Sequence, residues 1–127
     1  MVENGKNPPS EALEPSAASK ELEEFMWVIA EFTVVAIGVG VSLSQYVAAC
    51  EEVLQASGLN YELHANGTNL EGEWSEVVRV IQECHQRLHE MGVPRIATNI
   101  KISTRTDRDQ KMAEKTASVR RKLNQFQ

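Results

Sequence analysis

Residues 61–74 constrain the fold most, because they read as two short strands joined by a tight turn and followed at once by a helix. Asn66 and Gly67 separate the two strand-like runs, and both tolerate the positive φ that a two-residue type I′ turn requires. The segment therefore predicts an antiparallel hairpin that turns at Asn66-Gly67. Polar side chains crowd its strands, so we expect a functional site near the turn, although no catalytic signature accompanies them.

Residues 26–37, MWVIAEFTVVAI, are rich in β-branched and aromatic side chains and are closed by Gly38 and Gly40. This composition predicts the first strand. One of its faces is wholly apolar, and the other is largely apolar but carries Glu31 and Thr33. A half-exposed antiparallel strand should alternate more cleanly. Either something covers the second face, or that face lines a pocket.

The first helical segment follows these glycines and runs to about Ser57, with Gly58 in the position that commonly ends a helix. Ser42 and Gln45 have the spacing of a capping box, which predicts that Ser42 caps the helix start. Its predicted buried stripe consists of Tyr46, Val47, Cys50, Val53 and Leu54.

The second helical segment opens at Glu73-Trp74 and ends before Gly92 and Pro94. Its predicted buried stripe consists of Trp74, Val77, Val78, Ile81, Cys84, Leu88 and Met91. Residues 95–103 then alternate apolar and polar side chains, as expected for a last strand. Residues 109–124 predict a polar C-terminal helix with few apolar anchors.

The order β-α-β-β-α-β predicts an α+β, ferredoxin-like domain, in which two helices cover one face of a four-stranded antiparallel sheet. We assign residues 25–127 to this domain, including the C-terminal helix, and residues 1–24 to a disordered tail rich in Pro, Ser, Ala and Glu. The other face of such a sheet is bare in a monomer. Sheets from two or more subunits are therefore expected to meet there.

The charge of the chain argues against a nucleic-acid partner. The formal charge of the chain is −5. Residues 1–24 hold six acidic and two basic side chains, and the rest of the chain holds 12 acidic and 11 basic ones, so the folded part is nearly neutral. Residues 101–122 contain eight basic and three acidic side chains, but no aromatic residue interleaves to stack on bases. We interpret them as a solvated helix face.

The sequence predicts a cytoplasmic protein. Its two cysteines stand outside any paired motif, so we expect reduced thiols. It has no apolar signal segment and no run of about 20 apolar residues, so no membrane partner is expected.

Four strings resemble one known family when taken together in this order: AIGVGVSLSQYV (36–47), YELHANGTNLEGEW (61–74), RIATNIKI (95–102) and RTD (105–107). They are similar to the thiamine-binding-protein-like family, small ferredoxin-fold proteins long catalogued as uncharacterised. The resemblance covers roughly residues 26–124. It implies a homotetramer built from dimers, and a ligand that in some relatives is thiamine or its hydroxymethylpyrimidine moiety. Family members typically have Pro and Met at Ala65 and Asn66, and often Thr at Val39, so the pocket polarity is expected to differ.

A thiamine site needs a carboxylate for the cationic thiazolium, neutral polar groups for the aminopyrimidine and an apolar or aromatic wall. We expect such a site at a subunit junction, and the residues that could meet these needs lie in the hairpin, in the glycine-serine loop and on the first strand. The candidate ligand-binding residues are Glu31, Ser42, Ser44, Tyr61, His64, Asn66, Thr68 and Glu71. No cofactor or metal is expected.

Other interpretations stay open. His64, Glu71 and Glu73 could form the centre of an uncharacterised enzyme, and the chain could instead be a structural or regulatory oligomeric module without a ligand. The glycine-serine loop is explained as well by a turn and helix cap as by ligand contact. Glu31 could pair with Lys101 or Arg95 at an interface. His85 and His89 have a chelating spacing but no third ligand, so a hydrogen-bonded core or interface histidine is preferred for His85.

Overall fold

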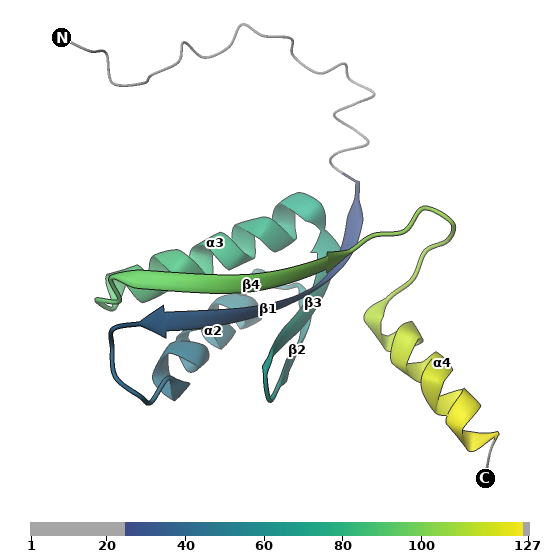
Figure 1. Ribbon diagram of the computed structural model, residues 1–127. Coiled ribbons are helices and arrows are strands. Elements are labelled where there is room, and N and C mark those ends of the chain that lie inside the picture. Colours follow the sequence, from purple (N-terminus) through teal and green to yellow (C-terminus); the bar gives the residue numbers. More distant parts are fainter. Residues whose placement is uncertain (1–24, 126–127) are drawn as a thin grey trace, which may run out of the picture.

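The computed structural model describes residues 25–125, so the predicted tail at residues 1–24 lies outside the described residues. The elements, in order, are β1 (Trp27–Ile37), α2 (Ser44–Ser57), β2 (Asn60–His64), β3 (Gly67–Glu73), α3 (Trp74–Glu90), β4 (Arg95–Ser103) and α4 (Met112–Asn124). The strands form one antiparallel sheet in the order β2-β3-β1-β4 (Figure 1). The predicted ferredoxin-like α+β fold and its C-terminal helix are confirmed.

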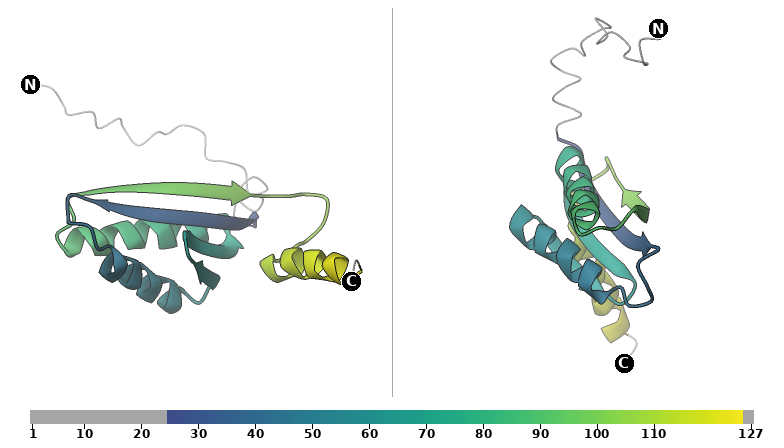
Figure 2. Two further views of the ribbon diagram at one scale, coloured as in Figure 1. Left: turned by 60° about the horizontal axis from the view of Figure 1, so that its bottom comes forward. Right: turned by 90° about the vertical axis from the view of Figure 1, so that its left-hand side faces the viewer.

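Helices α2 and α3 lie side by side on one face of the sheet, and α4 stands apart from this two-layer body (Figure 2). The core fills the space between the layers. Val28, Ala30 and Phe32 of β1 point into it and are at most 3% exposed. Leu54 of α2 and Leu88 of α3 meet them from the helical layer and are fully buried. Burial of these side chains is the main force that joins the layers.

The buried stripe of α3 differs from the prediction. Trp74, Val78 and Met91 are 41%, 42% and 43% exposed, whereas Val80, which was not in the predicted stripe, is fully buried. The buried residues are Val77, Val80, Ile81, Cys84 and Leu88. At 3.6 residues per turn these positions form one narrow face, and Trp74 and Val78 lie at its margin. Trp74 is therefore not a core anchor, because the sheet contacts the neighbouring face of the helix.

The start of α2 also corrects the prediction. The helix begins at Ser44 and its N-cap is Leu43, with no side-chain capping bond, so the predicted capping box at Ser42 is wrong. Instead the Leu43 carbonyl accepts from the amides of Tyr46 and Val47 at 3.0 and 3.1 Å. Ser42 precedes the N-cap, where its hydroxyl cannot take the capping position.

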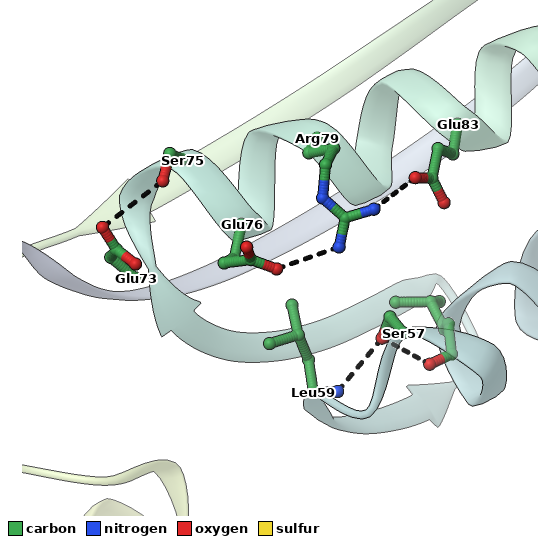
Figure 3. A network of polar contacts seen from close by, with 8 residues as sticks. Ser57, Leu59, Glu73, Ser75, Glu76, Arg79 and Glu83 are labelled. Atoms are coloured by element: carbon green, nitrogen blue, oxygen red, sulfur yellow. Dashed lines mark hydrogen bonds and ion pairs between the residues drawn. The ribbon is translucent and has the colours of Figure 1, made fainter. Parts of the chain in front are cut away.

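The other end of α2 is as predicted, since Gly58 takes the left-handed conformation, with φ of 76°. The Ser57 hydroxyl secures this end, donating to the Leu54 carbonyl at 2.6 Å and accepting from the Leu59 amide at 3.1 Å (Figure 3).

Across from this end, α3 carries an ion-pair ladder on its outer surface. Arg79 bonds Glu76 at 2.9 Å and also pairs with Glu83, one turn further along (Figure 3). Pairs at these spacings support an exposed helix by a few tenths of a kcal/mol each.

The predicted hairpin is present, but its turn lies one residue earlier, at Ala65 and Asn66. Gly67 is already the first residue of β3 and is not among the glycines with positive φ. Its need for glycine is steric. A Cβ at this position would lie 2.7 Å from Thr33 Oγ1 and 2.8 Å from the Phe32 carbonyl oxygen. The hairpin therefore packs directly against β1.

Within the part of the chain that the structure describes, the second face of the sheet carries no helical layer (Figure 2). Trp27, Val35 and Ile37 on this face are 42%, 36% and 36% exposed. We call it the open face. Helix α4 is joined to it at its start, where the Met112 amide donates to Glu71 Oε2 at 2.7 Å and Lys111 Nζ lies 4.2 Å from the centre of the Trp27 ring. No residue of α4 is buried.

Candidate ligand site

A cavity of about 290 Å³ lies between α2, the end of β1 and the β2-β3 hairpin. We call it the α2 cavity. Its walls are mainly apolar and include Phe32, Val34, Leu43, Tyr46 and Val47. Polar side chains on its lining come from β1, α2 and the hairpin, and these are Thr33, Glu51, His64, Asn66 and Thr68. Three predicted ligand-binding residues, His64, Asn66 and Thr68, are thus brought together on one cavity.

Glu51 supplies the carboxyl group of this cavity. Its Oε2 accepts from the Thr68 hydroxyl at 3.1 Å, and Thr68 is only 4% exposed. Its Oε1 is buried and has no hydrogen-bond partner. Burial raises the pKa of Glu51, and the bond from Thr68 opposes that rise only in part. The carboxyl is therefore biased toward its neutral, protonated form.

The sequence analysis missed Glu51. The available signal was a carboxylate four residues after Val47 and three before Leu54, at the edge of the apolar stripe of α2. Charged residues in such positions usually have a partner or a function.

His64 is the second polar group at the cavity with an unmet bonding capacity. Its Nδ1 accepts from the Asn66 amide at 3.3 Å, which in the neutral ring leaves Nε2 as the protonated nitrogen. Nε2 lies 3.4 Å from Glu31 Oε2, yet it is buried and makes no hydrogen bond. His64 thus borders the cavity with its Nε2 beside Glu31, and Glu51 supplies the cavity with a carboxyl.

The two cysteines lie beneath the same cavity. Cys50 lines it, and the Cys84 thiol donates to the Cys50 carbonyl at 3.8 Å. Both thiols are free and buried. The contact with Cys50 and burial raise the pKa of Cys84 far above its usual range. This position suits packing better than nucleophilic chemistry.

Two other predicted residues lie on a separate groove. Glu31 and Tyr61 border a space of about 630 Å³ between the open face and α4. Charged side chains of both signs line it, with Glu62 on the sheet and Lys115 and Arg120 on the helix. Lys101 on β4 lies opposite Glu31 on β1 in the strand register, but the Glu31 carboxylate forms its ion pair with His64.

Glu71 occupies a position of its own. It is 3% exposed, and its two oxygens accept from Asn60 Nδ2 at 2.8 Å and from the Met112 amide at 2.7 Å. Both carboxylate oxygens are thus used to join β2, β3 and α4. The predicted Ser42 and Ser44 are exposed, and neither borders the two cavities described above.

The alternative enzyme centre is not assembled. His64 is opposite Gly67 in the hairpin, so Glu71 lies four residues further along β3, roughly 13 Å away. Glu73 bonds Ser75 at 3.4 Å, not His64.

His85 and His89 make separate contacts rather than a shared site. His85 Nε2 lies 2.5 Å from Thr98 Oγ1, and His89 Nδ1 lies 2.7 Å from the Val93 carbonyl oxygen. The prediction of a hydrogen-bonded His85 is confirmed. Burial is the main cause that lowers the pKa of His85, and the charge of the neighbouring His89 lowers it further. Within residues 25–125, no group of three or more His, Cys, Asp or Glu side chains could hold a metal ion.

The RTD string forms a local clamp in the segment between β4 and α4. The Arg105 guanidinium donates to both oxygens of Asp107, at 2.7 and 2.5 Å, and to Gln110 at 2.8 Å. This contact lowers the pKa of Asp107 to about 2. The string therefore shapes a loop, and its cation is already paired.

Comparison with known proteins is decisive for the family. The sequence pattern of the family described as thiamine-binding protein matches residues 30–120. The chain belongs to the thiamine-binding protein family. A UPF0045 protein of Synechocystis is 51% identical over 94 residues, which cover 74% of this chain and 78% of the relative. Other UPF0045 members occur in fungi and archaea, at 38% identity in Eremothecium gossypii and 36% in Methanothermobacter thermautotrophicus.

Solved structures of similar proteins have the same fold. A Methanocaldococcus jannaschii protein superposes with a TM-score of 0.68 at 32% identity, covering 74% of this chain and 96% of that one. A Thermotoga maritima protein, for which a role in thiamine biosynthesis or salvage has been suggested, superposes with a TM-score of 0.63 over 73% and 98% of the two chains. At 22% identity, this second likeness supports the fold alone. None of the described helices is long and apolar enough to span a bilayer.

Proposed function

We propose that the protein binds thiamine or its hydroxymethylpyrimidine moiety in the α2 cavity. One observation carries the proposal beyond family membership. Within residues 25–125, two buried side-chain atoms lack a hydrogen-bond partner, Glu51 Oε1 and His64 Nε2, and both belong to residues that line this cavity. Buried polar groups in native proteins are nearly always paired, so a pair of exceptions at one cavity indicates an absent ligand or solvent partner.

The shape and polarity of the α2 cavity suit a small substituted ring. Its volume of about 290 Å³ lies at the small end of ligand pockets, which span roughly 300–1,000 Å³. Its apolar walls can enclose a pyrimidine, and Tyr46 and Phe32 supply aromatic surface. His64 and Thr68 can hydrogen-bond the polar edge of the ring. Glu31, 3.4 Å from His64, can face a thiazolium cation outside the cavity.

Under this proposal the predicted ligand-binding residues have different roles. His64, Asn66 and Thr68 are assigned to the pyrimidine, and Glu31 to the cation. Glu71 is assigned to structure, because both of its oxygens already have donors. Ser42, Ser44 and Tyr61 remain candidates for contacts with the part of the ligand that projects from the cavity.

Assembly is part of the proposal. The exposed apolar side chains of the open face support a homotetramer in which sheets pack against one another. The groove between this face and α4 then becomes a subunit junction.

Ligand binding is tested by calorimetry and by thermal shift with thiamine, its phosphates and hydroxymethylpyrimidine. Ligand at 100 times its dissociation constant should stabilise the native state by roughly 2.7 kcal/mol. Val47→Trp should abolish the effect, because Val47 is 39% exposed at the cavity wall and a larger ring there would fill the cavity.

Ala48→Trp is the matched control, since Ala48 is the next residue of α2, is exposed and does not line the cavity. Neither heat nor stabilisation in the unaltered protein at millimolar ligand would refute the proposed function.

A further inference from the structure

Among the side chains that line the α2 cavity, the Glu51 carboxyl and the Asn66 amide can each give and accept a hydrogen bond along a single edge, but of the two only Glu51 has a buried oxygen without a partner. Its Oε2 already accepts from Thr68 at 3.1 Å, and Thr68 has only this carboxyl as a side-chain partner among the described contacts. A hydroxyl that donates to Oε2 fixes that atom as an acceptor. The proton of a neutral Glu51 then belongs on Oε1, the oxygen without a partner.

We infer that Glu51 is the specificity-determining residue of the cavity and that, as a neutral carboxylic acid, it reads a ring edge that carries an amino group beside an unprotonated ring nitrogen. This inference rests on the proposed function and names the chemistry by which that site selects its ligand. The Oε1 hydroxyl donates to the ring nitrogen. Oε2 accepts from the amino group with its second lone pair.

The surroundings of Glu51 favour the neutral acid over a charge pair. Apolar side chains, among them Phe32, Val34 and Leu43, form most of the cavity wall, and the structure places no Lys or Arg side chain on it. A carboxylate without a cation in such a place would carry a large desolvation penalty. Burial also raises the pKa of Glu51, which likewise favours the protonated form. The titratable groups that also border the cavity are His64, Cys50 and Tyr46.

Glutamine is the decisive substitution, because its amide reproduces the neutral acid. It offers one acceptor and one donor in the same plane and has no charge, as in the pairing of Gln with adenine. Glu51→Gln should therefore bind hydroxymethylpyrimidine within about threefold of the unaltered protein. Glu51→Leu keeps the size but removes both bonds, and should lose about 10- to 100-fold in affinity, the value of one bidentate pair.

Isothermal calorimetry of the full chain with hydroxymethylpyrimidine provides the measurement. The same three proteins are titrated with an analogue in which hydrogen replaces the amino group. If Glu51 pairs with that group, the analogue should bind the unaltered protein at least fivefold more weakly, and Glu51→Leu should not distinguish the two ligands. Glu52→Leu is the matched control, because Glu52 is the next residue of α2, is exposed and bonds Arg87 outside the cavity.

The outcomes separate the two claims. If the unaltered protein does not bind hydroxymethylpyrimidine, the proposed function itself fails. If it binds and Glu51→Leu binds equally well, the role of Glu51 is overturned while the proposed function stands. If Glu51→Gln loses as much affinity as Glu51→Leu, the charged carboxylate is the binding form, and the neutral acid is overturned. Unfolding midpoints of each variant show whether a loss comes from misfolding.

Discussion

Buried carboxyl groups in this protein have opposite roles according to their partners. Glu71 has a hydrogen-bond donor at each oxygen, and both donors belong to other elements, which makes it a structural joint. Glu51 has a donor at one oxygen only, and its second oxygen is buried beside a cavity. A satisfied carboxylate stabilises its surroundings, whereas an unsatisfied one costs free energy unless a ligand or a proton compensates.

Glu51 should give the stability of the protein a specific pH dependence. Its pKa in the folded protein is raised above the ordinary value of 4.5. The folded state therefore holds the proton more tightly than the unfolded chain does. Its contribution to stability is full below pH 4.5 and is lost as pH rises through the raised pKa. Glu51→Gln cannot ionise, so it should gain stability relative to the unaltered protein as pH rises. Urea unfolding at a series of pH values measures this difference.

Glu52→Gln is the control for that experiment, because Glu52 is exposed on the same helix. A constant difference between Glu51→Gln and the unaltered protein from acid to neutral pH would contradict the prediction.

Removing Glu71 should both destabilise the fold and release α4. Glu71→Ala leaves Asn60 Nδ2 and the Met112 amide without their acceptor. We expect a loss of about 1–3 kcal/mol in the free energy of unfolding. The Met112 amide should also lose protection from hydrogen exchange. Glu90→Ala, which removes an exposed carboxylate at the end of α3, should change neither quantity. Unchanged protection at Met112 would show that another contact holds α4.

The β2-β3 hairpin is held in place by its approach to β1 rather than by its turn. Thr33 Oγ1 donates to the Asn66 carbonyl at 2.7 Å, which ties the turn to the central strand. Gly67 permits this approach because it has no side chain. The same contact places His64, Asn66 and Thr68 at the rim of the α2 cavity. The hairpin is therefore the element that builds the site.

Gly67→Ala should loosen this element. Its Cβ would lie 2.8 Å from the Phe32 carbonyl oxygen, a backbone atom that cannot rotate away. We expect a cost of about 1–3 kcal/mol, measured by chemical denaturation, and weaker ligand binding because the rim of the cavity moves. Adding Thr33→Ala relieves only the contact with Oγ1, so the double variant should recover part of the loss at most. Full stability in Gly67→Ala would mean that the strands separate without cost.

At the scale of the molecule, residues 25–125 form one covered sheet face and one face without a helical layer, and this asymmetry is the reason to expect assembly. A monomer with this many half-exposed apolar side chains on a flat sheet gains free energy by covering them. Helix α4 does not cover them, since it touches the sheet near Glu71 and extends away from the body (Figure 1).

Val35→Lys should therefore break the proposed tetramer. Val35 is 36% exposed on the open face, and a lysine there would place an unpaired charge in an apolar interface. Light scattering coupled to gel filtration measures the mass. Val78→Lys is the matched control, because Val78 is 42% exposed on α3, away from the open face. A monomer for the unaltered protein would contradict the proposal.

Local patterns were enough to predict the elements and their order. The β-branched and aromatic composition of residues 26–37, the alternation in residues 95–103, the helical spacing between them and the hairpin signal are all local features of the chain. The resemblance of four short strings was enough to identify the family. Errors of one or two residues, at the turn and at the start of α2, arose where several side chains fit the same local rule.

The tertiary structure decided which polar residues share a site. Thr68 reaches Glu51 only because β3 packs against α2, and Glu71 meets Met112 across 41 positions of sequence. Both Glu51 and Glu71 stand near apolar residues in the sequence, yet only Glu71 was predicted to bind a ligand. Whether such a carboxyl is paired or left unsatisfied depends on donors brought to it from distant segments, and the free energy of burying a charge depends on those donors.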